Sequence, residues 1–272
     1  MKISIITPSY NQAQFIKRTL DSVLIYQDYD NIEHIVIDGC SSDGTLKILK
    51  EYKNKYSDKL FYVYEKDLGQ SNAINKGFIK SKGDIIGWIN SDDYYEDNIF
   101  QFVVEFFQSN PDVDMIYGGC NRVDKKGIFI GKFEDDYYFK KCRIKNYKEF
   151  NYDTLLNIYS GLIPQPTVFY RRKVFEEVGY LDETYDFTMD YEYWLRIGKK
   201  CNIYRVDRVL ANFRSHDKTK TRFENRFGFF KEALKTRRNQ GGKLVAPFYL
   251  PIGLVIIKTI VKMIMIRLKI LQ

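Results

Sequence analysis

The sequence predicts an α/β protein whose sheet is mostly parallel and is covered by helices on both faces. Three observations lead to this fold class. Segments typical of strands alternate with segments typical of helices through the first 120 residues. The strand segments are short, continuous apolar runs, which suit strands buried on both faces. The chain has 44% hydrophobic and 29% charged residues, a composition typical of packed globular proteins.

Most elements of the first half have a recognisable start or stop signal. The β-branched run Ile3–Ile6 is stopped by Pro8, and apolar residues then recur at helical spacing from Phe15 to Leu24. Ser and Asp residues before Thr45 can cap the next helix, and Asn110-Pro111 ends the last one. The other strands are expected at 35–37, 61–64, 85–89 and 115–117, and the other helices from 45, over 71–79 and over 99–107.

The pattern is looser after residue 120. Strands are expected at 127–133, 166–170 and 209–213, and helices at 172–178 and 189–197. Since there is no internal repeat and no low-complexity linker, residues 1–217 are predicted to form one domain with two halves, 1–120 and 121–217. Residues 218–272 are predicted to form a separate tail.

The charge of the tail differs from that of the body. Residues 218–272 contain 13 Lys and Arg against Glu224 and Glu232, whereas residues 1–217 contain 30 basic and 33 acidic groups. An uncharged run over 244–257 is too short to span a bilayer, and Lys258, Lys262 and Lys269 then share one side of a helix. The tail is thus predicted to be a basic amphipathic helix on a membrane surface, the alternative being a helix packed on the body. Nucleic acid would also be attracted to the tail, but the slightly acidic body argues against it.

The cysteines and the N-terminus bear on the compartment. Free thiols suit a reducing compartment, and neither a zinc site nor a disulfide framework is indicated by the scattered positions of Cys40, Cys120, Cys142 and Cys201. The apolar run at the N-terminus is too short for a signal peptide. We expect a cytoplasmic protein, peripheral on the inner face of the cell membrane.

The strongest chemical feature is the pair Asp92-Asp93, directly after an apolar strand. Two adjacent carboxylates there are costly unless a cation or hydrogen-bond donors compensate them. Mg²⁺ and Mn²⁺ take such oxygen ligands together with substrate phosphates. Asp93 is therefore the candidate metal ligand, and Asp92 would face a ribose or share the metal. By itself, the segment could also be a capped turn.

Three further polar clusters are expected near this pair, because ligands of such sheets bind beyond the carboxyl ends of the strands. Asp38 ends the second strand and could accept hydrogen bonds from a base or a ribose. The first strand ends in residues that could pack against the same base, and a later helix offers N–H groups and a positive dipole end to phosphate. These candidate binding residues are Pro8, Ser9 and Tyr10 for the base, and Asp67, Asn72 and Asn75 for the helix start.

Together these residues make the chain resemble the family 2 glycosyltransferases. The matching motifs are Ile5–Asn11, Ile37–Thr45, Asp67–Gly77 and Gly83-Asp84 through to Asp93, within a resemblance that covers roughly residues 1–215. It implies a Rossmann-like fold of the GT-A type, with nucleotide-sugar binding in 1–120 and acceptor binding in 121–217. It also implies that Tyr10 and Asp38 bind the base, that Asp92-Asp93 is the metal motif, and that the transfer is inverting. One departure is Cys40, where the family often has Asn or Ser.

An inverting transfer needs a general base for the acceptor hydroxyl. The segment Thr188–Arg196 resembles the acidic motif of the family, and by that match Asp190 is the base. The family usually has Glu where this chain has Met189. Asp186 and Glu192 are alternative bases, and Asp190 could instead only cap its helix.

His216 resembles a family histidine that reaches the metal or the diphosphate, and imidazole suits Mn²⁺. The expected cofactor is Mn²⁺ or Mg²⁺. The chain is thus predicted to transfer a sugar from a nucleotide diphosphate sugar to a glycan or lipid-linked glycan. The resemblance and the tail favour a role in bacterial surface polysaccharide synthesis (capsule, O-antigen or exopolysaccharide).

Two other functions compete with this prediction. A sugar nucleotidyltransferase would need a Gly-rich phosphate loop after the first strand, and residues 7–11 contain no glycine. A non-catalytic nucleotide-sugar-binding membrane scaffold would not need acidic residues at several strand and helix ends. No nucleic-acid partner is expected.

Overall fold

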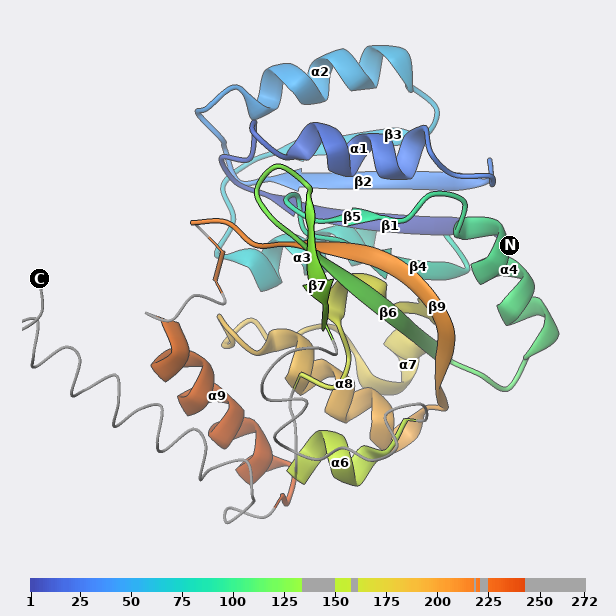
Figure 1. Cartoon of the computed structure of the whole chain (residues 1–272), viewed down its shortest axis with the longest axis vertical. Coiled ribbons are helices and arrows are strands. Elements are labelled where there is room, and N and C mark those ends of the chain that lie inside the picture. The colour runs from blue at the N-terminus through green and yellow to red at the C-terminus, as the bar shows by residue number, and fades with distance from the viewer. Residues whose placement is uncertain (134–149, 158–160, 218, 221–224, 243–272) are drawn as a thin grey trace, which may run out of the picture.

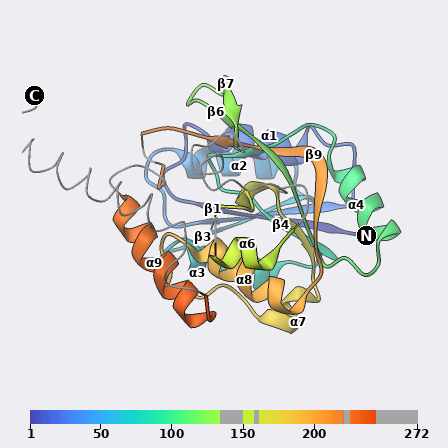
Figure 2. The same cartoon turned by 60° about the horizontal axis from the view of Figure 1, so that its bottom comes forward.

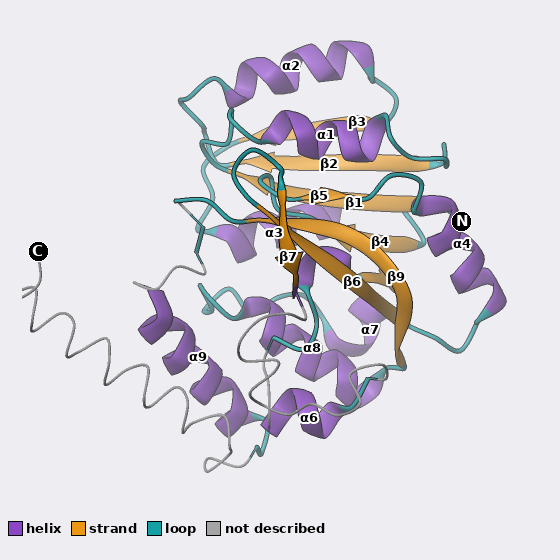
Figure 3. Cartoon of the chain, in the orientation of Figure 1, coloured by secondary structure: helices purple, strands orange, loops and turns teal. Residues whose placement is uncertain are grey.

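The computed structural model of the chain describes residues 1–133, 150–157, 161–217, 219–220 and 225–242 (Figure 1). The described strands are β1 (Ile3–Ser9), β2 (Ile32–Asp38), β3 (Leu60–Tyr64), β4 (Ile85–Trp88), β5 (Tyr94–Tyr95), β6 (Met115–Val123), β7 (Phe129–Lys132), β8 (Phe169–Arg171) and β9 (Ile203–Arg214). The described helices are α1 (Ile16–Leu24), α2 (Thr45–Lys55), α3 (Gln70–Lys80), α4 (Phe100–Ser109), α6 (Tyr152–Asn157), the 3-10 helix η2 (Gln165–Thr167), α7 (Val174–Val178), α8 (Met189–Lys200) and α9 (Arg226–Asn239). The strands form one sheet in the order β3-β2-β1-β4-β8-β6-β9-β5, with β7 paired to β6 (Figure 3).

The first half of the sheet is parallel, as predicted. β1 lies between β2 and β4 and pairs in parallel with both, and β2 pairs in parallel with β3. β1 continues one residue past Pro8, at which the strand was predicted to stop. The ladder between β1 and β4 ends at Ile6 and Trp88. The Ile6 carbonyl points toward β4, where it accepts from the Ile89 N–H. The backbone of Pro8, two residues later, points to the same side, beyond the end of the ladder with β4. The N–H that proline lacks therefore removes no hydrogen bond between strands.

The second half of the sheet is mixed. β6 pairs in parallel with β9, whereas β8 is antiparallel to both β4 and β6. The strand predicted at 166–170 is the short helix η2 followed by β8, and the strand predicted at 209–213 is the longer β9. β5 was not predicted, because its two residues, Tyr94 and Tyr95, become a strand only by pairing with Asn212 and Ala211.

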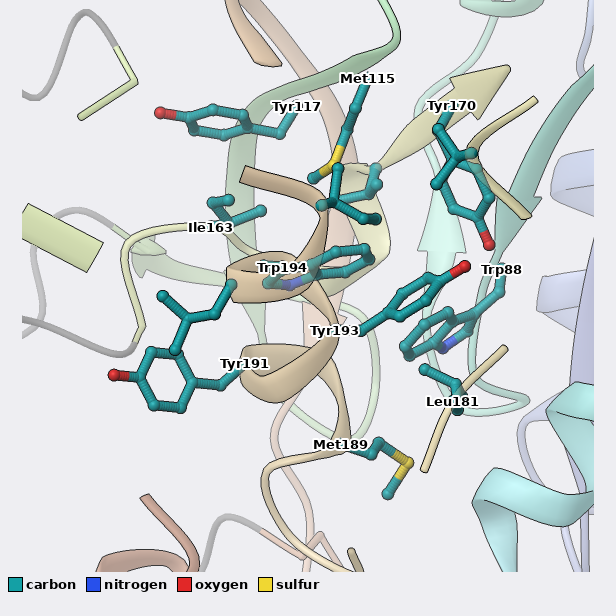
Figure 4. Close-up of a cluster of buried hydrophobic side chains, with 14 of the residues drawn as sticks. Trp88, Met115, Tyr117, Ile163, Tyr170, Leu181, Met189, Tyr191, Tyr193 and Trp194 are labelled. Atoms are coloured by element: carbon teal, nitrogen blue, oxygen red, sulfur yellow. The ribbon is translucent and has the colours of Figure 1, made fainter. Parts of the chain in front are cut away.

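Helices cover both faces of the sheet, and each face has its own apolar core. α1 and α2 lie on one side, and α3, α7 and α8 lie on the other (Figure 2). The second core contains Trp88 of β4 and Trp194 of α8, whose rings stack with centroids 5.5 Å apart (Figure 4). At Gly77 in α3, an added Cβ would lie 2.4 Å from a side-chain carbon of Ile6, so the close approach of α3 to β1 requires glycine.

Part of the predicted tail packs on this second face. Helix α9 contacts α8, with Ala233, Thr236 and Arg237 buried. The predicted amphipathic helix around 244–269 lies outside the described residues. Within the described part of the chain, no helix has the length and apolar character needed to cross a bilayer.

Candidate active site

The carboxyl ends of the parallel strands bring several predicted residues together. Ser9, Asp38 and Tyr64 are neighbours in register at the ends of β1, β2 and β3. Gly39 follows at this edge, and a Cβ there would lie 2.5 Å from Asp67 Oδ2 and 3.4 Å from Tyr10 Cδ2. Segments far apart in the chain therefore meet around one glycine.

Asp38 organises the loop after β2. Its side chain is fully buried, with Oδ1 accepting from the Ser41 N–H at 2.8 Å and Oδ2 from the Ser9 and Ser41 hydroxyls at 3.0 and 2.7 Å. The next turn places Cys40 at φ 65°, in the left-handed region. Asn adopts this region more readily than most residues, which gives a physical reason for the Asn that the family often has here. Recognition of the base by Asp38 remains a prediction.

Tyr10 has the exposure expected of a base-stacking residue. The side chain of Tyr10 is 63% exposed at the end of β1, whereas the Ser9 residue before it is buried. Close by, Asp67 Oδ1 accepts from the Gly69 N–H at 3.0 Å and so fixes the turn into α3. An exposed aromatic ring beside a fixed polar turn is a suitable surface for a nucleotide base.

Asn72 and Asn75 connect α3 to the second half of the chain. Asn75 is buried; it donates to the Leu181 carbonyl at 3.0 Å and to Glu183 at 2.9 Å, and accepts from the Leu181 N–H at 3.0 Å. Asn72 donates to the same Glu183 carboxylate at 3.0 Å. The structure thus gives both amides a role in joining the two halves, and donor binding by them remains a prediction.

A second link between the halves was not expected from the sequence. Gln70 at the start of α3 donates to Asn90 at 2.8 Å, and Asn90 donates to Gln165 at 3.2 Å. Gln165 in turn donates to the Trp88 carbonyl at 2.7 Å. Gln70 and Asn90 lie inside the quoted motifs, but which side chains they meet depends on η2, which is distant in sequence. This network holds the loop before Asp92 against the start of α3.

The pair Asp92-Asp93 lies in the loop between β4 and β5, and the two carboxylates have different surroundings. Asp93 is buried; its Oδ1 accepts from the Arg214 N–H at 2.8 Å, and its Oδ2 has no hydrogen-bond partner among the described residues. Burial and the neighbouring Asp92 charge raise the pKa of Asp93 well above its ordinary value. Asp92 is more open, with 18% of its side chain exposed.

His216 and Arg214 bring the end of β9 to this pair. His216 Nε2 lies 2.8 Å from Asp92 Oδ2, and its ring packs on Phe15 with centroids 4.5 Å apart. Arg214 is buried and donates from Nε to the Asp92 carbonyl at 2.8 Å. The resemblance pointed to His216, and the structure places it beside Asp92. Arg214 was missed, although it stands two residues before that histidine.

These groups fit a divalent cation. The buried, unpartnered Oδ2 of Asp93 and the repulsion between two adjacent carboxylates are what a cation would compensate. Among the residues that the structure describes, no group of three His, Cys, Asp or Glu side chains is placed so that it could hold a metal ion by itself. A cation at Asp92, Asp93 and His216 would therefore need further oxygens from a ligand, as Mg²⁺ and Mn²⁺ commonly take from phosphates.

Asp190 lies in the first turn of α8, next to the start of α3. Its neighbour Met189 accepts from the Ser71 hydroxyl at 3.1 Å, and Ser71 follows Gln70 of the network above. Burial, aided by the charge of Glu232, raises the pKa of Asp190 to about 6. Of the alternative bases, Glu192 is bound by Arg196 at 2.7 and 2.8 Å, and Asp186 is exposed. The role of Asp190 as general base remains a prediction.

Glu232 of α9 holds the segment that leads into α8, a role that sequence reasoning missed. Its carboxylate accepts the backbone N–H groups of Asp186, Phe187 and Thr188 at 3.0, 2.9 and 2.9 Å. These N–H groups precede the helix, so the acceptor that fixes the segment leading into α8 comes from a different helix. No local pattern of the sequence signals this contact.

The arrangement defines a class of protein before any relative is considered: an α/β sheet with acidic and imidazole groups gathered at the carboxyl edge of its parallel strands. The model of the family described as glycosyl transferase family 2 matches residues 4–179. The chain therefore belongs to the family 2 glycosyltransferases, as the motifs predicted.

Individual relatives agree with this membership. An uncharacterized glycosyltransferase of Rickettsia bellii is 32% identical over 216 residues, which are 79% of this chain and 30% of that protein. A putative teichuronic acid biosynthesis glycosyltransferase of Bacillus subtilis is 36% identical over 132 residues, which are 48% of this chain and 51% of that protein. The chain also spans 64% of a Rickettsia typhi relative.

Solved structures share the GT-A fold. TarS of S. aureus in complex with UDP-GlcNAc has a TM-score of 0.64 at 19% identity, covering 88% of this chain and 66% of that chain. The mannosyltransferase PcManGT of Pyrobaculum calidifontis, in complex with GDP-Man and Mn²⁺, has a TM-score of 0.66 at 17% identity, covering 91% of this chain and 66% of that chain. The predicted fold class is confirmed.

Proposed function

We propose that this chain transfers a sugar, with inversion, from a nucleotide diphosphate sugar to a hydroxyl of a glycan or lipid-linked glycan. The observation that carries the proposal is that two adjacent residues at the start of α3 contact both segments: Gln70 binds Asn90, just before the Asp92-Asp93 pair, and Ser71 binds Met189, just before Asp190. The first segment offers carboxylates that a cation would compensate, and such a cation would neutralise a diphosphate. The second offers a carboxyl with a pKa of about 6. These are the two requirements of an inverting displacement.

The candidate residues would bind different parts of the donor. Tyr10 and the loop after Asp38 would hold the base and ribose, with Pro8, Ser9 and Asp67 shaping that surface. The N-terminal N–H groups of α3, near Asn72 and Asn75, would face phosphate. Asp92, Asp93 and His216 would hold Mn²⁺ or Mg²⁺, which when bound neutralises charge on the leaving diphosphate.

Asp190 acts on the acceptor. As the acceptor oxygen forms its bond to the anomeric carbon and the bond to the diphosphate oxygen breaks, the carboxylate of Asp190 takes the hydroxyl proton. With a pKa of about 6, Asp190 is deprotonated in most molecules at neutral pH and is more basic than an ordinary Asp. Glu232 holds the approach to α8 and so orients this carboxylate.

The relatives support the substrate class and the setting. TarS is solved with UDP-GlcNAc, and PcManGT with GDP-Man and Mn²⁺. The relative from Bacillus subtilis is named for teichuronic acid biosynthesis. We propose a role in bacterial surface polysaccharide synthesis, with the body peripheral on the inner face of the cell membrane and residues 218–272 contributing to that attachment.

A thermal-shift screen of UDP-GlcNAc, UDP-glucose and GDP-mannose, with and without Mn²⁺, tests the proposal. At least one nucleotide sugar should raise the melting temperature, and Mn²⁺ should increase the effect. Asp92→Asn and His216→Ala should each raise the nucleotide-sugar concentration needed for the Mn²⁺-dependent shift about tenfold or more. Losses of this size are typical when the surroundings of a bound metal are altered. Exposed Asp58→Asn is the matched control.

Enzyme assays with the same donors separate the remaining functions. EDTA should abolish donor hydrolysis and transfer, and Mn²⁺ or Mg²⁺ should restore both. Full activity in chelator would refute the metal assignment. Release of pyrophosphate from a nucleoside triphosphate and a sugar phosphate would identify a nucleotidyltransferase, and donor binding with neither hydrolysis nor transfer would favour the scaffold.

A further inference from the structure

A positively charged pocket of about 500 Å³ lies among α1, the turn between β6 and β7, and the end of β9. None of its lining residues is one of the predicted site residues. The charged residues that line it are Lys17, Arg18, Asp21, Lys125, Lys126 and Arg214. Five cations against one carboxylate make this a pocket for an anion.

Aromatic rings hold the two arginines in place. The guanidinium of Arg18 lies 4.8 Å from the ring centres of both Tyr26 and Tyr94, and that of Arg214 lies 5.1 Å from Phe15 and 5.2 Å from Tyr94. Such stacking orders a guanidinium without neutralising it. The charge of Arg18 therefore stays available to a ligand, whereas Arg214 also donates to the Asp92 and Lys125 carbonyls at 2.8 and 3.0 Å.

The acidic groups nearby are already engaged. Asp21 accepts a hydrogen bond from the Tyr52 hydroxyl, and Asp124, on the turn itself, accepts from the Lys126 and Ile128 N–H groups at 2.8 and 2.9 Å. Lys17 and Lys125 are exposed and form no ion pair with any described residue. Arg214 lies beside the buried Asp93 and is left out of the balance. Lys17, Arg18, Lys125 and Lys126 against Asp21 and Asp124 still leave an excess of two positive charges.

An exposed apolar arm adjoins the pocket. Ile128, Phe129 and Ile130 are 60%, 57% and 53% exposed, and a single glycine separates them from the two lysines of the turn. They lie on or beside β7, which pairs only with β6 among the described strands, and the β6–β7 hairpin projects from the body beyond α1 (Figure 2). Exposed apolar side chains gathered on a projecting hairpin suit a binding surface.

We propose that the arm and the pocket together form a docking surface for an anionic lipid bilayer. Ile128, Phe129 and Ile130 enter the interface between headgroups and acyl chains, while the lysines and Arg18 bind lipid phosphates. A soluble phosphate would leave the apolar arm without a role, and a second copy of the chain would bring two like-charged surfaces together. The surface is separate from residues 243–272 and does not rest on the proposed transfer reaction.

Co-sedimentation of the full chain with phosphatidylcholine vesicles, with and without phosphatidylglycerol, tests the surface. Binding should require phosphatidylglycerol. The double variant Lys125→Gln/Lys126→Gln should bind about 30-fold more weakly, given the attraction of each basic residue near an anionic membrane. Phe129→Ser should weaken binding about tenfold, through lost apolar burial. The double variant Lys47→Gln/Lys50→Gln, on exposed residues of α2, removes the same charge elsewhere and should bind as the unaltered chain does.

Three results would overturn the proposal. Unchanged vesicle binding by both the lysine and the Phe129 variants would place the membrane contact elsewhere in the chain. Displacement from vesicles by inorganic phosphate, at an ionic strength matched with chloride, would show a site for soluble anions. Dimerisation that Phe129→Ser abolishes, with vesicle binding unaltered, would make the arm a contact between copies. Circular dichroism and melting temperature of each variant serve as folding controls.

Discussion

Replacing Asp190 by Asn should stabilise the fold at neutral and alkaline pH while it slows transfer strongly. The pKa of the Asp190 carboxyl is raised from 3.8 to about 6, first by burial and then by the charge of Glu232. A carboxyl whose pKa is higher in the folded than in the unfolded state favours folding when protonated. Its ionisation therefore costs stability progressively as the pH rises from about 3.8 to about 6, and the loss is constant above that range.

The size of the effect follows from the two pKa values. The cost of ionising Asp190 is about 3 kcal/mol near pH 8 and falls to about 1 kcal/mol near pH 4.5. Asn carries no charge and keeps the oxygen that accepts from the Tyr191 N–H at 2.7 Å. Asp190→Asn should therefore be more stable than the unaltered chain by these amounts, and most at high pH.

Urea unfolding at the two pH values measures the difference, and comparison with the unaltered chain cancels the contribution of other titrating groups. Transfer by the variant should fall at least about 100-fold, as for loss of a general base, while donor binding stays intact. The exposed Asp58→Asn variant should show no pH-dependent gain in stability. Equal stability of Asp190→Asn and the unaltered chain near pH 8 would refute the argument that burial raises the pKa of Asp190. Near-normal turnover would show that Asp190 is not the general base and only helps to start its helix.

Two further substitutions test the surroundings of the site. Glu232→Gln keeps an acceptor for the N–H groups of 186–188 but removes the charge that helps to raise the pKa of Asp190. The acid limb of the pH–rate profile should therefore move to lower pH. An unmoved profile would mean that the Glu232 charge does not act on the base. Cys40→Asn should raise the free energy of unfolding by about 0.5–1 kcal/mol, because Asn tolerates the φ of 65° found there better than Cys does. Thermal melting measures the change. A lower melting temperature would show that the contacts of the Cys40 thiol stabilise the fold more than the unfavourable φ destabilises it.

Local patterns were sufficient for the parallel half of the fold and for the edge of the sheet at which the candidate residues gather. Buried β-branched runs and capped helix starts are decided within a few residues, which is why β1 to β4 and α1 to α3 lie close to their predicted positions. Pairing between distant segments is not encoded in this way. Tyr94-Tyr95 becomes a strand only beside Asn212 and Ala211, and the 203–208 part of β9 is ordered by β6.

The same distinction applies to the candidate site. The motifs pointed to Asp92, Asp93 and His216, which the structure brings together, but not to the Arg214 contacts that fix the loop from the far end of the chain. They identified Asn75 as a polar residue at a helix start, whereas its amide is used in joining α3 to Leu181 and Glu183. A motif specifies which residue types stand near an edge, and the tertiary contacts decide which of their atoms face a ligand.

The contact between Glu232 and the start of α8 has a consequence for how the enzyme domain is delimited. Residues 1–217 contain the proposed general base, yet the carboxylate that holds the three N–H groups before it belongs to α9. Arg237 of the same helix is buried and donates from Nε to the hydroxyl of Tyr191 at 3.2 Å. Tyr191 follows the proposed base in the sequence. A chain cut at residue 217 would lose both contacts and leave the backbone before α8 without its acceptor. The basic segment after residue 217 therefore helps, through α9, to fix the start of α8 and with it the position of the proposed base, whatever the residues beyond it bind.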